Sequence, residues 1–103
     1  MHSTDFFTII QSEKPVLVDF YADWCEPCKW LEPVLDETQK MLGNDAEILR
    51  LDIDLHPDLK KQFHILSVPV LAVFKNGELL WRMNGFMYAK ELSQKVREFV
   101  PAH

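Results

Sequence analysis

The chain has 103 residues, of which 48% are hydrophobic and 26% charged, and it contains two cysteines. This length suits one domain that buries most of its apolar surface, and two cysteines are too few for a disulfide-rich secreted scaffold. A formal net charge of -5 argues against a nucleic acid as the main partner, because nucleic-acid binders normally present a basic surface.

The sequence also argues against a membrane protein. The longest uncharged apolar run, Val68 to Phe74, is too short to cross a bilayer. The N-terminus lacks the basic and then apolar segments of a signal peptide. We therefore expect no membrane partner and a cytoplasmic location, although a chain from which a leader had been removed would look the same.

Hydrophobic periodicity predicts an alternation of helices and strands. In chain order these are a short helix capped by Ser3 or Thr4, a strand at 16–21, a helix from 26 to about 42, a strand at 48–53, a short helix that begins at Pro57, strands at 70–74 and 79–83, and a helix from Ala89 whose buried stripe includes Phe99 and Val100. The last two strands flank Asn76-Gly77, which is a strong signal for a hairpin.

The order of these elements predicts an α/β fold. Alternating strands and helices favour parallel strand pairing, and the closing hairpin adds an antiparallel strand. We expect a mixed sheet of about four strands with helices on both faces. Chemistry in such sheets lies at the carboxyl ends of the strands, which is where Cys25 falls.

The two cysteines, Cys25 and Cys28, are separated by two residues at the start of the second predicted helix. A helix start favours a thiolate, so we expect an exposed Cys25 to be the nucleophile. Cys28 lies one turn further and shares a helix face with Leu31, so we expect it to be a buried resolving cysteine. Pro27 stiffens the segment between them.

Two other interpretations of the cysteine pair fit the sequence less well. A zinc site needs further ligands, and the spacing of His56 and His64 does not fit the usual pattern of zinc fingers. An inert structural disulfide, or two idle core thiols, would fit poorly with a helix start beside Trp24. Thiol-disulfide exchange is the favoured chemistry, with no metal.

The segment Trp24-Cys25-Glu26-Pro27-Cys28-Lys29 resembles the active site of the thioredoxin family. The resemblance covers nearly the whole chain, and its other features are Val18 to Ala22, Pro33, Val68-Pro69, the hairpin at 75–78 and Gly85. It implies a single thioredoxin domain over residues 1–103 and a dithiol-disulfide oxidoreductase without a cofactor. Its implied partners are disulfide-containing proteins and a reductase that recharges the dithiol.

The resemblance also implies a substrate-binding surface. A cis Val68-Pro69 bond beside the cysteines would expose the Val68 backbone for pairing with an extended substrate. The full set of expected substrate-binding residues is Trp24, Pro27, Val68, Pro69, Gly85 and Phe86. Pro33 is expected to kink its helix, which is a structural role.

Asp19 interrupts an apolar strand six residues before Cys25. Desolvation of a buried carboxylate should raise the pKa of Asp19, so that it could act as general base on the Cys28 thiol. The alternative is a structural aspartate that is held by hydrogen bonds.

Three departures from the family pattern carry expectations of their own. Glu26 stands where glycine is commonest and should disfavour the Cys25 thiolate. His64 should adopt a left-handed backbone where the family often has glycine. The N-terminal edge strand of full-length members is missing, so residues 48–53 would form an edge that is open to pairing, although we expect a monomer.

A second functional class remains open on sequence alone. The chain could be a thioredoxin-fold interaction module or a dedicated redox subunit that serves one target. An oxidase or isomerase is a third possibility, because the direction of exchange depends on the reduction potential and the compartment.

Overall fold

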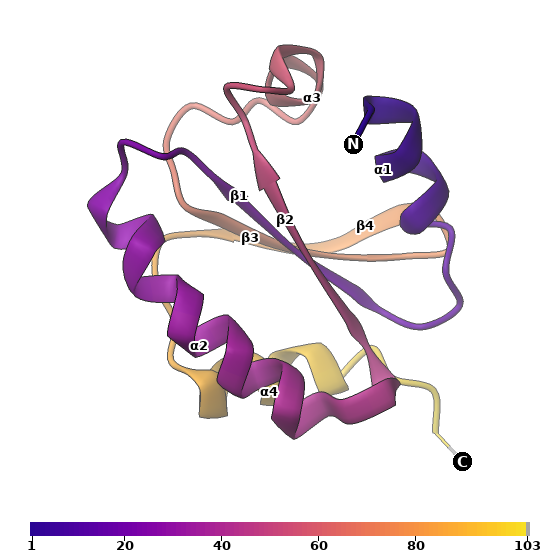
Figure 1. Ribbon diagram of the computed structural model, residues 1–103. Helices are drawn as coiled ribbons and strands as arrows, with labels where there is room; N and C mark the ends of the chain where they lie inside the picture. Colours follow the sequence, from indigo (N-terminus) through magenta and orange to yellow (C-terminus); the bar gives the residue numbers. More distant parts are fainter. Residues whose placement is uncertain (103) are drawn as a thin grey trace.

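The structure is a computed structural model that describes residues 1–102 (Figure 1). Its elements are, in order, α1 (Ser3–Ile9), β1 (Val16–Tyr21), α2 (Glu26–Leu42), the 3-10 helix η1 (Gly43–Asp45), β2 (Glu47–Asp52), α3 (Pro57–Gln62), β3 (Val70–Lys75), β4 (Glu78–Asn84) and α4 (Ala89–Arg97). Every element expected from the sequence is present, and its bounds agree to within one or two residues except at the end of α4, which is three residues shorter than expected.

The four strands form one mixed sheet in the order β2-β1-β3-β4. β1 pairs with β2 in parallel and with β3 antiparallel, and β3 pairs antiparallel with β4. The expected thioredoxin fold with about four strands is confirmed. Within residues 1–102 no strand precedes β1, and β2 is therefore an edge strand, as expected.

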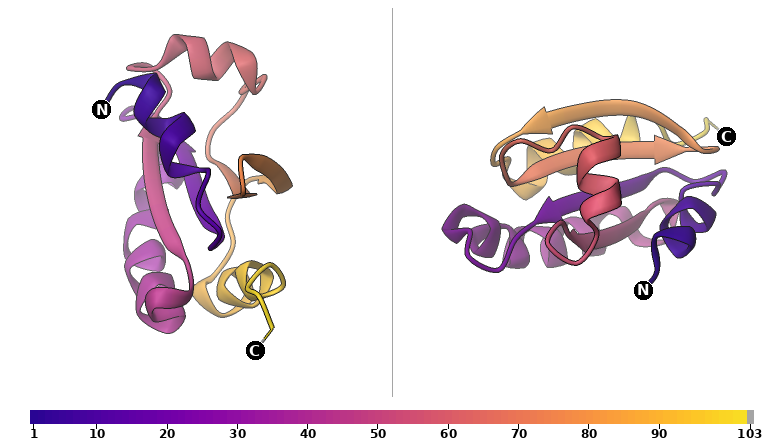
Figure 2. Two further views of the ribbon diagram at one scale, coloured as in Figure 1. Left: turned by 90° about the vertical axis from the view of Figure 1, so that its right-hand side faces the viewer. Right: turned by 90° about the horizontal axis from the view of Figure 1, so that it is seen from above.

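Helices cover both faces of the sheet, with α1 and α3 on one side and α2 and α4 on the other (Figures 1 and 2). Successive side chains of a strand point to opposite faces, so each strand contributes to two separate cores. Val16, Val18 and Phe20 of β1 belong to the core beneath α1 and α3. Leu17 belongs to the core beneath α2 and α4. By the same alternation, Asp19 lies on the α2 face.

The long helix α2 sets the position of the cysteine pair. It begins after Cys25, continues through Pro33 and ends at Gly43, whose φ of 56° is left-handed. Its buried stripe consists of Cys28, Leu31, Leu35, Thr38 and Leu42. Met41, one residue before the end of the helix, is 44% exposed and lies outside this stripe.

The ends of two helices also differ from expectation. α1 begins at Ser3 after the cap residue His2, whose backbone N–H donates to the Asp5 carboxylate at 2.8 Å, so neither Ser3 nor Thr4 is the cap. The acidic third residue of the helix therefore supplies the capping interaction. α4 ends at Arg97, so Phe99 and Val100 follow the helix and are only half-buried.

The β3–β4 hairpin turns as the Asn-Gly signal predicts. Asn76 and Gly77 have φ angles of 51° and 82°, as a two-residue turn of this type requires. Their backbone N–H groups donate to the carbonyls of Ser12 and Ile10, which ties the turn to the end of α1. No helix within residues 1–102 has the length and apolar character needed to cross a membrane.

Candidate active site

Cys25 and Cys28 form a disulfide at the start of α2, with Cα atoms 5.3 Å apart. Cys25 is the N-cap residue, with an extended backbone, and the Cys28 N–H donates to Cys25 Sγ at 3.2 Å. Pro27 lies in the first turn, where its missing N–H leaves no helical hydrogen bond unmade. The Cys25 sulfur therefore occupies the end of the helix that favours negative charge.

The expected exposure of Cys25 is not observed. In the disulfide form the residue is 4% exposed and Cys28 is 1% exposed, and both belong to the core beneath α1 and α3. Trp24, in contrast, is 69% exposed. Cys25 is covered because a distant loop, which ends at Val68, packs against it.

That loop brings the predicted Val68-Pro69 bond to the cysteines. The bond is cis, and the Val68 carbonyl oxygen lies 3.7 Å from Cys25 Sγ. The Gly85 N–H donates to the Pro69 carbonyl at 2.9 Å, so the segment after β4 lies against the cis Val68-Pro69 segment. Three predicted site segments, at Cys25, Val68-Pro69 and Gly85, therefore meet at one place.

The remaining aromatic residues of the predicted surface lie differently. The Trp24 indole N–H donates to the Asp54 carboxylate at 3.0 Å, which fixes the exposed ring beside the cysteine. Phe86 is half-buried and packs against the core beneath α2 and α4, with its ring 4.9 Å from that of Tyr88. The structure therefore gives Phe86 contacts on the face opposite to the core that holds the cysteines.

Asp19 is completely buried in β1 and has an ion-pair partner that sequence reasoning did not find. Its Oδ2 accepts from Arg50 Nε at 3.1 Å, whereas Oδ1 has no hydrogen-bond partner among residues 1–102. Desolvation outweighs the attraction of Arg50 and raises the pKa of Asp19 to about 6. The carboxyl can therefore hold or release a proton near neutral pH.

Arg50 joins Asp19 to two further groups at the protein surface. Its Nη1 donates to Glu32 Oε1 at 3.3 Å, and its guanidinium lies 4.1 Å from the centre of the Tyr21 ring. Arg50 stands directly opposite Asp19 in the parallel β1–β2 register. The presence of an arginine in the next predicted strand was the only hint in the sequence of a partner for Asp19. Whether the two residues stand opposite each other depends on the strand register.

Two departures from the family pattern can now be located. The Glu26 carboxylate forms an exposed ion pair with Lys29 at 3.2 Å, so its charge beside Cys25 is partly offset. His64 has φ of 52°, which confirms the predicted left-handed backbone.

The residues of the zinc alternative do not form a ligand set. The ring nitrogens of His56 lie 3.1 and 2.9 Å from the carbonyl oxygens of Asp52 and Met1. In the described part of the chain, no group of three or more His, Cys, Asp or Glu side chains is placed to hold a metal ion.

Comparison with known proteins agrees with this site. A family model described as thioredoxin matches residues 1–98. The chain belongs to the thioredoxin family. It is 40% identical over 89 residues to a thioredoxin-like protein of Synechocystis, covering 86% of this chain and 85% of that protein. It is 35% identical to a bifunctional thioredoxin reductase/thioredoxin of Mycobacterium leprae, covering 93% of this chain and 21% of that protein.

Comparison with a solved structure shows that the chain also has the thioredoxin fold. A mutant thioredoxin from Halobacterium salinarum superposes with a TM-score of 0.87 at 28% identity, covering all of this chain and 89% of that one. Family membership, together with the disulfide-forming Cys25–Cys28 pair, shows that the chain is a thiol-disulfide oxidoreductase of the protein-disulfide reductase type.

Proposed function

We propose that Cys25 is the attacking thiolate and Cys28 the resolving thiol in the reduction of protein disulfides. Reduced Cys25 attacks one substrate sulfur, the substrate S–S bond breaks, and a mixed disulfide forms while one substrate thiolate leaves. Cys28 then attacks Cys25 Sγ, which closes the Cys25–Cys28 disulfide and releases the second substrate thiolate. The observation that carries this assignment is the N-cap position of Cys25, whose Sγ accepts from the Cys28 N–H.

Asp19 is proposed as the general base for the second step. Its pKa of about 6 leaves it mostly ionised at neutral pH but able to take up the proton that the Cys28 thiol loses. Cys28 is 1% exposed and Asp19 is completely buried, so the proton of the Cys28 thiol has little direct access to solvent. We expect Asp19→Asn to slow resolution of the mixed disulfide at least tenfold, with a smaller effect on its formation.

The substrate surface is proposed to surround Cys25. It consists of Trp24, Pro27, Val68, Pro69 and Gly85, together with Phe86, which follows Gly85 but packs against the core beneath α2 and α4. The position of the Val68 carbonyl beside Cys25 Sγ supports pairing of a substrate backbone along this segment.

The proposed partners are disulfide-containing proteins and a thioredoxin-reductase-like electron donor. The fusion of a reductase to a thioredoxin in the Mycobacterium leprae relative supports the second partner. We further propose a monomer that works in the cytoplasm, where thiol systems keep such dithiols reduced.

Trapping experiments test the roles of the two cysteines. Cys28→Ser should accumulate a mixed disulfide between Cys25 and a protein substrate, detectable by mass spectrometry, whereas Cys25→Ser should accumulate none. Reduction of insulin with a chemical reductant separates a general reductase from a dedicated subunit, because a dedicated subunit should be slow on this generic substrate. Equal trapping by both cysteine variants would contradict the assignment.

A further inference from the structure

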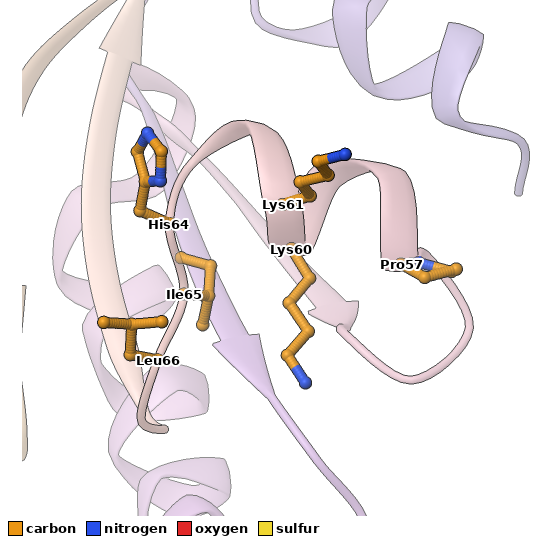
Figure 3. Close-up of a pocket in the computed structure, with 6 residues that line it drawn as sticks. All are labelled: Pro57, Lys60, Lys61, His64, Ile65 and Leu66. Atoms are coloured by element: carbon orange, nitrogen blue, oxygen red, sulfur yellow. The ribbon is translucent and has the colours of Figure 1, made fainter.

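A groove lies on α3 and the loop that follows it, outside the cysteine site. It has a volume of about 250 Å³. We call it the α3 groove. It is lined by Pro57, Lys60, Lys61, His64, Ile65 and Leu66 (Figure 3). Ile65 is buried beneath it, whereas Leu66 is 93% exposed. A fully exposed leucine beside an apolar floor is a surface that another chain could cover.

The charge of the α3 groove is opposite to that of the protein as a whole. The chain carries a net charge of -5, but Lys60 and Lys61 line the groove and form no ion pair within residues 1–102. The one carboxylate of α3, Asp58, has a lowered pKa because it hydrogen-bonds Ser3 of α1, and it does not line the groove. Lysines at a helix end also suit the helix dipole, but this does not explain the exposed leucine beside them.

The loop of the groove is held firmly by β4. Arg82 donates to the carbonyls of Phe63 and His64, the second through Nη2 at 3.2 Å. Asn84 Nδ2 donates to Ser67 Oγ at 2.9 Å. Leu66 therefore projects from a segment that is braced on both sides, which reduces the entropy lost when a partner covers it.

The α3 groove also lies close to the cysteine site along the chain. Leu66 precedes Val68 by two residues, so their Cα atoms are at most about 7.6 Å apart. The Val68 carbonyl is in turn 3.7 Å from Cys25 Sγ. An extended substrate rises about 3.3 Å per residue, so a side chain about two to four residues from the target cysteine can reach Leu66.

We propose that the α3 groove is an accessory binding site for protein substrates. Its occupant is a segment near the target cysteine in which an apolar side chain is flanked by carboxylates. The apolar side chain packs on Leu66 and Ile65, and the carboxylates pair with Lys60 and Lys61. This inference rests on the proposed function, because the segment belongs to the same polypeptide whose disulfide Cys25 attacks.

Single-turnover reduction of matched peptides tests the charge component. The substrates are two disulfide-bridged peptides that differ only in carrying Asp-Leu-Asp or Asn-Leu-Asn three residues from a cysteine. Pre-reduced protein should reduce the Asp peptide about threefold to fivefold faster at low ionic strength, which is the range of an exposed ion pair. Lys60→Glu should abolish or reverse this preference.

The matched control is Lys40→Glu, which reverses a lysine in the last turn of α2, about 20 Å along that helix from Cys25. This variant should keep the wild-type preference. Equal rates for the two peptides in the wild type, or the same preference in Lys60→Glu, would overturn the accessory site. Failure to reduce either peptide would overturn the proposed function, and with it the substrate assigned to the groove.

A third peptide, with Asp-Ser-Asp in place of Asp-Leu-Asp, tests the apolar component. The wild type should reduce it more slowly than the Asp-Leu-Asp peptide, whereas Leu66→Ser should not distinguish the two. Sedimentation velocity of the same proteins addresses the other occupant, a second copy of the chain. A wild-type dimer that dissociates in Leu66→Ser would assign the groove to self-association and overturn the proposal.

Discussion

Burial of the Asp19 carboxylate lowers the stability of the fold but raises its pKa into the range useful for proton transfer. Asp19 is fully buried, one of its carboxylate oxygens has no partner in the described chain, and its ion pair with Arg50 does not compensate for the lost hydration. A carboxylate in that position destabilises the fold above its pKa. The same raised pKa is what suits it to exchange a proton near neutral pH.

The effect of Asp19 on stability has a defined dependence on pH. Its pKa rises from 3.8 to about 6 on folding, so between these values the folded state holds more protons than the unfolded state. Stability therefore falls as pH rises through this window. The shift corresponds to about 3 kcal/mol, fully expressed above the folded pKa.

We expect Asp19→Asn to raise the free energy of unfolding by about 2 to 3 kcal/mol above the folded pKa, and to flatten the dependence on pH below it. Urea unfolding of the oxidised proteins on both sides of the window measures this. Asp36→Asn, an exposed change on α2, is the control and should leave the pH profile unaltered. A destabilised Asp19→Asn protein would show that the Arg50 ion pair outweighs desolvation.

Glu26 and Lys29 form an exposed ion pair in the first turn of α2, beside Cys25. Because their ion pair partly cancels both fields, we expect Glu26→Gln to speed alkylation of reduced Cys25 by about threefold or less, the size of an exposed charge in water. Lys29→Gln should slow it by a similar factor, and the double variant should resemble the wild type. Iodoacetamide kinetics at neutral pH measure these rates, and a large effect of Glu26→Gln alone would contradict the offset.

At the level of elements, β4 holds the loop that carries the Val68 backbone, which is proposed to face the substrate. Its hydrogen bonds reach Phe63, His64 and Ser67, and Gly85 after it contacts Pro69. The segment from 63 to 69 lacks helix or strand structure, so the bonds to Phe63, His64 and Pro69 satisfy backbone carbonyls that secondary structure leaves unpaired, whereas Ser67 accepts through its side chain. The position of Val68 beside Cys25 depends on them.

Replacing Arg82 should loosen this loop. We expect Arg82→Met to lower the free energy of unfolding by about 1 to 3 kcal/mol and to speed amide hydrogen exchange over residues 63–68. Arg97→Met is a matched control, because Arg97 also donates to a backbone carbonyl, that of Met41, but joins α4 to α2. Unchanged exchange at 63–68 in Arg82→Met would show that the loop is held by packing alone.

For the whole molecule, β2 is the feature that bears on association. It is an edge strand of the sheet, but Arg50 interrupts its apolar residues, and Glu47 and Asp52 stand at its two ends. Charges on an edge strand oppose pairing with a second sheet, and the net charge of -5 adds repulsion between copies.

We therefore expect a monomer. Sedimentation velocity over two orders of magnitude in protein concentration should give one unchanged sedimentation coefficient in the oxidised state. A coefficient that rises with concentration would indicate pairing through an exposed surface. Arg50→Glu would then identify β2 as that surface if it restored the monomer.

Sequence alone is enough to predict the order of helices and strands, the Asn76-Gly77 turn and the placement of Cys25 at a helix start. These features depend on periodicity and on residues close in the chain, so local physics is sufficient to predict them. The apolar strand around Asp19 likewise predicted a raised pKa, because burial follows from the residues on either side.

The surroundings of those residues, in contrast, depend on contacts between distant parts of the chain. Arg50 meets Asp19 because the parallel register of β1 and β2 aligns them, and register depends on how the connecting helix packs. Cys25 is covered because a loop 43 residues away in sequence reaches its sulfur. The α3 groove likewise needs α3 and its loop to be braced by β4, and such long-range contacts leave no periodic signal in the sequence.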